Sequence, residues 1–348
     1  MPTTPDITYF RQKLLHMMCT SDVSDENFTS LALDIFRFQF EYNLPYQNYC
    51  KALHREPKHI NHWSNIPSIS TDSFKVLEYP LSTIPASEVT HAFLTSGTTS
   101  DIRGKHLLPT LDLYEASLLA TWKRLTLPEP KTVVILCPSP ENAPESSLSH
   151  MMGVLADYYT DAEIIWAISE NGEMNFQSLQ ILAEKNQPVA MLGTAIAFLH
   201  LFENISIPLP SGSFAMETGG YKGTNRQMSK ETLYQLFEEK LNIPSHSVIN
   251  EYSMTELSSQ FYTRGIGSSH GSPAWTRTRV IDPRTGNDSI IGEPGHLLIY
   301  DLANLYSVSA IQTQDIAIAE ENGSFTLLGR DPTALPRGCS RAADHSLK

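Results

Sequence analysis

A cysteine near the C-terminal end is the residue whose type and position first suggest chemistry. Cys339 lies two residues after Arg337 and close to the last residue, Lys348. A thiolate reacts where a thiol does not, and a neighbouring cation favours the thiolate. Cys339 is therefore a candidate acceptor for an acyl group, provided that another part of the chain activates a carboxylate. The alternative is an unreactive thiol on a short tail.

A run of small hydroxyl residues around a glycine is the first candidate for such an activating site. The run follows three apolar residues and consists of Thr95, Ser96, Gly97, Thr98, Thr99 and Ser100. Loops of this composition can turn backbone N–H groups and hydroxyls toward phosphate oxygens, and Lys105 could add a positive charge. The GxxxxGK[ST] spacing of a P-loop is absent. The alternative is a polar turn between a strand and a helix.

The segment from Asn250 to Glu256 is the second candidate, because it follows a predicted strand and α/β sheets bind ligands beyond the carboxyl ends of their strands. Tyr252 could stack on a purine and Thr255 could bond a phosphate. Glu256 could hold Mg²⁺. The same residues would also serve to cap a following helix.

Isolated residues elsewhere fit a nucleotide and an acid. Gly219 and Gly220 could let the backbone approach a planar ligand closely, or they could belong to a flexible loop. Asp315 could accept hydrogen bonds from ribose hydroxyls and Arg330 could donate them, although each also fits a solvated surface position. His150 could close a carboxylate pocket, or it could be a histidine in the first turn of a helix with no catalytic part.

The elements that must position these residues alternate between strand and helix. Apolar runs predict strands over 132–137, 163–168, 189–192 and 247–251, and the intervening patterns predict helices over 147–159, 177–185, 195–202 and 230–241. This alternation predicts an α/β fold with doubly wound, mostly parallel sheets that helices cover on both faces.

The two ends of the chain differ from this middle part. The first sixty residues read as largely helical, with one helix through Phe28, Ile35 and Tyr42 that Pro45 is expected to end. After about residue 275, short strands separated by turn signals predict a small antiparallel, β-barrel-like subdomain.

The composition favours a soluble cytoplasmic enzyme. The chain has 348 residues, of which 41% are hydrophobic, and 25 basic against 38 acidic residues give a net charge of −13. No Lys/Arg block suggests a nucleic-acid partner. The sequence lacks an apolar run of the ~20 residues that span a bilayer, and its start does not resemble a signal peptide. The four cysteines lie far apart, which disfavours a cysteine-based metal site or a disulfide framework.

Taken in order, these segments resemble the adenylate-forming superfamily and, more closely, the LuxE-type acyl-protein synthetase family. The resemblance covers nearly the whole chain. It includes Phe38-Gln39-Phe40 and Ile66-Pro67-Ser68 near the N-terminus, and the superfamily's ribose region at Asp301 to Asn304 followed by Asp315. The run Arg337-Gly338-Cys339-Ser340 matches the family's C-terminal cysteine motif. Each motif is modestly specific, whereas their joint order is strongly so.

The resemblance implies a ligase that uses ATP and Mg²⁺. A carboxylic acid, of which a long-chain fatty acid is favoured, would attack the α-phosphate to give an acyl-adenylate and pyrophosphate. The acyl group would then pass to a thiol of the protein and on to a partner reductase. The implied roles are phosphate binding by Thr95 to Thr99, adenine binding by Gly219, Gly220 and Tyr252, α-phosphate contact by Thr255, Mg²⁺ binding by Glu256, ribose binding by Asp315 and Arg330, and acyl acceptance by Cys339.

The sequence departs from the superfamily pattern at several points. Ser100 and Gln314 stand where other residues are usual. The small C-terminal domain with its catalytic lysine is expected to be absent, so adenylation would be slow or would rely on Lys105 or Lys222. The expected organisation is an N-terminal helical region over 1–90, an ATP-binding core over 91–328, and a hinge-like turn and tail over 329–348.

Two other hypotheses stay open. The chain could activate an aryl or other acid and release the adenylate, or hand it to coenzyme A or a carrier. It could also bind nucleotide without turnover. Replacement of Cys339 separates the first from the acyl-protein synthetase hypothesis, and pyrophosphate exchange separates the second.

Overall fold

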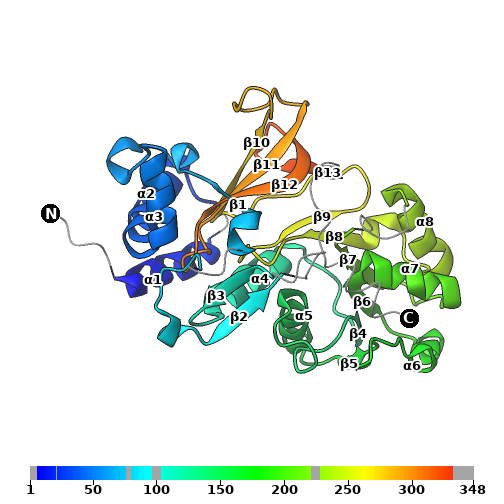
Figure 1. Cartoon of the computed structure of the whole chain (residues 1–348). Helices are drawn as coiled ribbons and strands as arrows, with labels where there is room; N and C mark the ends of the chain where they lie inside the picture. Colours follow the sequence, from blue (N-terminus) through cyan, green and yellow to red (C-terminus); the bar gives the residue numbers. More distant parts are fainter. Residues whose placement is uncertain (1–5, 21, 76–79, 96–102, 221–227, 332–348) are drawn as a thin grey trace.

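The computed structural model describes residues 6–20, 22–75, 80–95, 103–220 and 228–331. Its largest sheet has six strands in the order β5-β4-β6-β7-β8-β9. The strands are β4 (Thr132–Leu136), β5 (Glu163–Trp166), β6 (Val189–Thr194), β7 (Phe214–Thr218), β8 (Val248–Tyr252) and β9 (Phe261–Arg264). All neighbouring strands are parallel except β8 and β9 (Figure 1).

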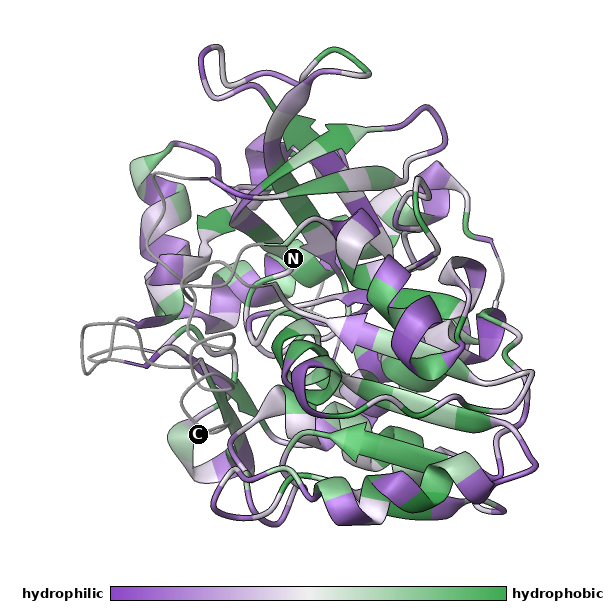
Figure 2. Ribbon diagram, turned by 90° about the vertical axis from the view of Figure 1, so that its right-hand side faces the viewer, coloured by the Kyte–Doolittle hydropathy of each residue, from purple (hydrophilic) through white to green (hydrophobic). Residues whose placement is uncertain are grey.

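Helices cover both faces of this sheet, as the sequence predicts. Side chains alternate between the faces of a strand, and all of β4 is buried. Val133 and Ile135 pack with α4 (Asp112–Arg124) and α5 (Ser147–Tyr158), whereas Val134 and Leu136 pack with α7 (Ala195–Asn204) and α8 (Lys230–Leu241). The apolar colour of the central strands against the mixed colour of the helices reflects this burial (Figure 2).

A second sheet contains the C-terminal strands. These are β10 (Thr276–Ile281), β11 (Pro294–Asp301), β12 (Ala310–Ala319) and β13 (Phe325–Arg330). They pair in antiparallel fashion, and the short strand β1 (Ile69–Ser70) joins β12 in parallel. The predicted antiparallel region after residue 275 is confirmed. A separate hairpin is formed by β2 (His91–Leu94) and β3 (Lys105–Leu108).

The N-terminal helices pack beside the second sheet (Figure 1). They are α1 (Ile7–Met18), α2 (Asp25–Tyr42) and α3 (Leu44–Ala52). Two buried amides of this region bond to the turn after β11, which we call the 304–309 turn. The Gln39 amide donates to the Asn304 carbonyl (2.8 Å) and accepts from the Ser309 N–H (3.0 Å), and the Asn43 amide donates to the Ser307 carbonyl (3.1 Å).

Some sequence predictions of local structure need correction. Pro45 does not end the first long helix: α2 ends at Tyr42, and Pro45 lies in the first turn of α3, where its missing N–H costs nothing. The helix predicted over 177–185 is instead α6 (Phe176–Gln180) continued by the 3₁₀ helix Ile181–Glu184. The sequence analysis also missed strands β7 and β9 and helix α4.

Short 3₁₀ helices connect several of these elements. They span Pro57–His59, Trp63–Asn65, Thr71–Lys75, Ala86–Glu88 and Ser245–Ser247. No helix within the described residues is both long and apolar enough to cross a membrane. The division of the chain at residues 90 and 328 stays a prediction.

Candidate active site

The carboxyl ends of strands β7 and β8 form the edge at which most of the predicted site residues that the structure describes gather. Gly219 and Gly220 directly follow β7, and Tyr252 is the last residue of β8. Gly219 has a φ of +74°, a conformation that disfavours any residue with a Cβ. No described atom lies within 4 Å of a Cβ built on either glycine. The backbone here therefore remains approachable, as the planar-ligand hypothesis requires.

The structure brings Tyr252, Asp315 and Arg330 together from three strands. The Tyr252 hydroxyl donates a hydrogen bond of 2.7 Å to Oδ2 of Asp315 in β12. Asp315 is directly opposite Arg330 in the pairing of β12 with β13, and Arg330 donates to the side chain of Gln314. The Tyr252 ring is buried against Phe325 at a centroid distance of 5.8 Å. The residues predicted to hold adenine and ribose thus form one contiguous group.

The loop after β8 carries Thr255 and Glu256, both of which are buried. Side chains of distant segments hold its backbone in place. Nδ1 of His106 in β3 bonds the Thr255 carbonyl (2.9 Å), and the Asn304 amide donates to the Glu256 carbonyl (2.8 Å). Burial lowers the pKa of His106 to about 4, so its ring is neutral at pH 7. Sequence reasoning missed His106, whose only signal was a histidine directly before the apolar pair Leu107 and Leu108.

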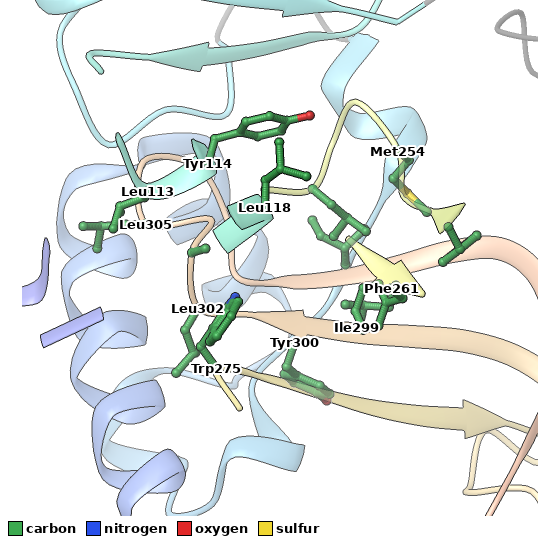
Figure 3. Packing of buried hydrophobic residues seen from close by; sticks show 14 of the residues in the cluster. Leu113, Tyr114, Leu118, Met254, Phe261, Trp275, Ile299, Tyr300, Leu302 and Leu305 are labelled. Carbon is green, nitrogen blue, oxygen red and sulfur yellow. The ribbon is translucent and has the colours of Figure 1, made fainter. Parts of the chain in front are cut away.

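Asp301 at the end of β11 holds the same loop from the other side. Its Oδ2 accepts from the Ser258 N–H (3.0 Å), and its Oδ1 accepts from the Ser259 hydroxyl (2.7 Å) and the Ala303 N–H (3.0 Å). The side chain is fully buried, and burial raises its pKa to about 6. Met254 and Phe261, which flank the loop, and Trp275 belong to the core that packs around it (Figure 3).

Only one residue of the predicted phosphate run is described, because Ser96, Gly97, Thr98 and Thr99 lie outside the described residues. The Thr95 hydroxyl accepts from the Gly104 N–H (2.7 Å), and the Thr95 carbonyl accepts from Nε of Arg103 (2.8 Å). Arg103 also pairs with Glu145 (2.8 Å). Lys105 is exposed at the start of β3 and pairs with Leu94 across the hairpin. Arg103 therefore anchors the base of this run, a role that its sequence setting did not indicate.

His150 lies in the first turn of α5, half-buried. Its Nε2 lies 3.0 Å from Oε1 of Glu115, and its ring packs against Phe93 and Tyr114 at 5.5 and 5.8 Å. Burial lowers the pKa of His150, and Glu115 opposes that shift. Its part in closing a carboxylate pocket stays a prediction.

Two carboxyl groups at this edge were not singled out by the sequence analysis. Glu217 of β7 accepts from the Asn250 amide (2.8 Å) and from the Tyr234 hydroxyl of α8 (3.1 Å), and burial raises its pKa to about 7. Glu251 of β8 accepts from the Thr218 hydroxyl, and burial raises its pKa to about 6. The registers of β7 with β8 place Glu217 beside Asn250 and Glu251 beside Thr218, so the two carboxyl groups lie on opposite faces of the sheet.

The predicted acyl acceptor, Cys339, and Lys222 lie outside the described residues. Among the described cysteines, Cys50 and Cys137 are buried, and burial raises the pKa of each thiol to about 12. Cys19 is exposed. Neither buried thiol is therefore suited to act as a nucleophile at neutral pH.

The residues present fit Mg²⁺ only as a companion of a nucleotide. Within the described ranges, no group of three or more His, Cys, Asp or Glu side chains could hold a metal ion alone. Mg²⁺ that is bound together with ATP needs only one or two protein carboxylates beside the substrate phosphates. Glu256, held near the carboxyl end of β8 through its backbone, can be such a carboxylate.

Comparisons with known proteins give both a family and a fold. A family model described as "Acyl-protein synthetase, LuxE" matches residues 16–348. ATP-bound MatB from Rhodopseudomonas palustris is structurally similar, with a TM-score of 0.52 at 15% identity over 79% of this chain and 54% of MatB. A 2-hydroxyisobutyryl-CoA ligase in complex with 2-HIB-AMP gives a TM-score of 0.62 at 15% identity over 87% of this chain and 67% of the ligase. In an open conformation with 2-HIB-AMP and CoA, the values are 0.61, 15%, 89% and 76%.

The structural likeness shows the mixed α/β fold of adenylate-forming ligases, which the sequence predicted. The chain spans about half the length of MatB. No curated protein sequence matches the chain.

Proposed function

The chain belongs to the LuxE acyl-protein synthetase family, and from this premise we propose that it activates a carboxylic acid with ATP and then carries the acyl group on Cys339. In the first step, a carboxylate oxygen attacks the α-phosphorus and pyrophosphate leaves. In the second step, the Cys339 thiolate attacks the acyl carbon of the mixed anhydride, and AMP leaves with the electron pair of the broken C–O bond. The acyl group then passes to a partner reductase.

The observation that carries this proposal is the convergence of Tyr252, Asp315 and Arg330 beside the loop of Thr255 and Glu256. An aromatic ring and a carboxylate joined at the carboxyl end of a parallel sheet suit an adenosine. We propose that Gly219, Gly220 and Tyr252 frame adenine, and that Asp315 and Arg330 bind the ribose.

Other segments of the chain are proposed to bind the phosphates of the nucleotide. We propose that Thr95 to Thr99 and Lys105 bind the phosphates and that Thr255 contacts the α-phosphate. Mg²⁺ held by Glu256 and the phosphates would supply charge neutralisation during the transfer. Hydroxyls and N–H groups held by a fixed backbone stabilise developing charge without reorganising, which is why the bonds of His106, Asn304 and Asp301 to the loop matter.

His150 is proposed to line the end of the acid site where the reacting carboxylate lies. Burial lowers its pKa, so at pH 7 the neutral ring carries a single N–H, which faces Glu115 in the free protein. We propose that this N–H turns from Glu115 to the bound carboxylate and donates one hydrogen bond without forming an ion pair that would weaken the nucleophile. The family resemblance favours a long-chain fatty acid as the substrate, an acyl-CoA-reductase-type protein as the partner and the cytoplasm as the location.

The test is the intact mass of the purified protein after incubation with ATP, Mg²⁺ and a pool of fatty and aromatic acids. We expect one added acyl group that neutral hydroxylamine removes and that Cys339→Ser abolishes. Cys19→Ser is the matched control, because Cys19 is the exposed cysteine among the described residues, and it should retain the added mass.

Other outcomes separate the alternatives. Acid-dependent pyrophosphate exchange without added mass would contradict the thioester step and favour release of the adenylate or transfer to coenzyme A or a carrier. ATP binding with neither exchange nor added mass would contradict the enzymatic proposal and favour a nucleotide-binding protein.

A further inference from the structure

One face of the large sheet carries a group of buried polar side chains beside the proposed nucleotide site. Glu251 of β8 is directly opposite Thr218 in β7 and Tyr262 in β9, so the three side chains lie on the same face. Gln260 lies directly before β9, and its side chain bonds that of Tyr114, whose pKa the Glu251 carboxylate also raises. Helix α4 covers this face, with Trp122 packed against the Tyr262 ring at 5.6 Å. We call Glu251, Gln260 and Tyr262 the polar triad.

Each member of the polar triad has a buried atom without a hydrogen-bond partner among the residues that the structure describes. The atoms are Oε1 of Glu251, Oε1 of Gln260 and the hydroxyl of Tyr262. The side chains belong to residues that are 2%, 1% and 6% exposed. Buried polar groups are nearly always paired, because an unpaired one bears the full cost of leaving water. Three such atoms at one face indicate that this face is built to receive a polar group.

The charge state of the triad defines which polar group fits. Burial raises the pKa of Glu251 to about 6, although hydrogen bonds from the Ser253 and Thr218 hydroxyls lower it. The carboxyl is therefore still largely ionised at pH 7.5 and acts as an acceptor. Thr218 occupies its Oε2 and leaves Oε1. Burial and the Glu251 carboxylate raise the pKa of Tyr262 well above 10, so the phenol stays protonated. Two acceptor oxygens and one hydroxyl call for a ligand group that donates.

The polar triad lies next to the residues proposed for the reaction. Glu251 directly precedes Tyr252, and the loop of Thr255 and Glu256 joins β8 to β9, which carries Tyr262. Tyr114 of α4 connects the triad to His150: Glu251 helps to raise the pKa of Tyr114, and the Tyr114 ring contacts His150 at 5.8 Å. Tyr114 therefore links the polar triad to the residue that is proposed to face the reacting carboxylate.

We propose that Glu251, assisted by Gln260 and Tyr262, selects a carboxylic acid that bears a hydroxyl or amino group on its chain or ring. The selection rests on the proposed adenylation and narrows its substrate class. An unsubstituted alkyl or aryl acid lying on this face would leave the carboxylate unpaired and would exclude water from it, which penalises that acid by roughly tenfold to a hundredfold. A donor group on the acid completes the triad instead.

The test is acid-dependent ATP–pyrophosphate exchange with matched acids. Benzoate is compared with the hydroxybenzoate and aminobenzoate isomers, and dodecanoate with hydroxydodecanoate and aminododecanoate isomers. In the wild type, we expect at least one substituted acid to exceed its parent in kcat/KM by about tenfold or more. Glu251→Leu should reduce that ratio to about one or invert it, whereas Glu251→Gln should reduce it by only about threefold, because an amide still accepts but more weakly than a carboxylate.

Glu163→Gln is the matched control, since Glu163 lies at the opposite end of the same sheet, at the start of β5, in an exposed ion pair with Lys185. It should keep the wild-type ratio. Folding of each variant is checked by circular dichroism, and the wild-type comparison needs no variant at all.

The outcomes distinguish this inference from the function on which it rests. If acids support exchange but every parent acid equals its substituted analogues in the wild type, or if a folded Glu251→Leu keeps the preference, adenylation stands and the selection by Glu251 is wrong. If no acid supports exchange, the adenylation itself is contradicted, and the inference falls with it.

Discussion

The hydroxyl of Tyr252 donates a 2.7 Å hydrogen bond to the carboxylate of Asp315 and thereby joins the two large sheets of the molecule. Tyr252 ends a parallel strand of one sheet, and Asp315 lies in the middle of a long strand of the other. Both are buried. The bond fixes the tyrosine ring and the carboxylate relative to each other at the proposed nucleotide site.

Loss of this bond should weaken both ATP binding and the fold. Tyr252→Phe keeps the ring and leaves Asp315 without this donor. We expect a loss of about 1–3 kcal/mol in the free energy of unfolding, measured by urea denaturation, and a rise in the KM for ATP of roughly five- to fiftyfold. Tyr49→Phe is the control, since its hydroxyl donates to the Ser68 carbonyl at an exposed position, and it should leave both quantities nearly unchanged. An unaltered KM in Tyr252→Phe would contradict a nucleotide at this position.

Asp301 should support the loop of Thr255 and Glu256 without touching substrate. Asp301→Asn replaces one carboxylate oxygen with NH₂, and either orientation of the amide turns that NH₂ toward a donor, because all three partners of Asp301 donate. We expect a loss of about 2–4 kcal/mol of stability and a fall in kcat/KM for ATP, since the loop moves. Asp288→Asn removes an exposed ion pair with Arg279 and should cost less than about 1 kcal/mol. Equal stability of the two variants would refute the anchoring role.

Glu217 should make stability fall as pH rises. Burial raises its pKa to about 7 in the folded protein from an ordinary value of 4.5, so the folded state holds its proton through a pH range in which the unfolded state releases it. The advantage of the neutral carboxyl is complete below pH 4.5 and is lost as pH rises through 7. Glu217→Gln keeps an acceptor for Tyr234 and Asn250. We expect its stability relative to wild type to improve by on the order of 2 kcal/mol between pH 5 and pH 8.

The comparison with wild type is needed because other buried groups titrate in the same range. Burial lowers the pKa of His106 to about 4 and that of His270 to about 3, and both shifts act in the opposite direction below pH 6.5. They cancel in the difference between the two proteins. Glu163→Gln changes an exposed position, so its free energy of unfolding, measured by urea denaturation, should change with pH as that of the wild type does. If the stability of Glu217→Gln also changes with pH as that of the wild type does, the raised pKa of Glu217 is contradicted.

Glu256→Gln should impair chemistry while sparing the fold. The structural bond of this residue to Asn304 uses its backbone carbonyl, which the substitution retains. We expect pyrophosphate exchange to fall by about a hundredfold and the Mg²⁺ concentration for half-maximal rate to rise, because one carboxylate ligand is lost. Glu239→Gln on the exposed side of α8 should behave as wild type. Unchanged Mg²⁺ dependence in Glu256→Gln would place the metal elsewhere.

The sequence predicted the alternation of strands and helices well, because these elements depend on the local pattern of apolar and polar residues. The strand over 132–137 and the helix over 195–202 are confirmed to within a few residues, since a short run rich in β-branched residues favours a strand and a longer apolar run favours a helix. Strand β7 was missed because Glu217 and Thr218, which end it, read as part of a polar, glycine-rich turn. Their polarity reflects the site rather than exposure.

The partners of the site residues could not be predicted, because they depend on contacts between distant segments. The bond from His106 to the Thr255 carbonyl spans 149 positions, and that from Tyr252 to Asp315 spans 63. The motifs indicated which residues gather, whereas the supporting side chains of Asp301 and Asn304 acquire their meaning only from the fold. Glu251 was part of a recognised motif, yet its unpaired oxygen is visible only in three dimensions.

The bonds of the Gln39 and Asn43 amides can form only late in the synthesis of the chain, because their partners lie near its C-terminal end. The partner carbonyl of Gln39 lies 265 residues further along the chain. A ribosome that adds roughly 5–20 residues per second needs on the order of 10–50 s to reach it. During that interval, Phe28 of α2 lacks Arg277 of β10, whose guanidinium lies 4.3 Å from the centre of its ring in the folded protein. The nascent N-terminal helices are therefore natural clients for a chaperone, and a slowed translation of the last strands would lengthen their exposure.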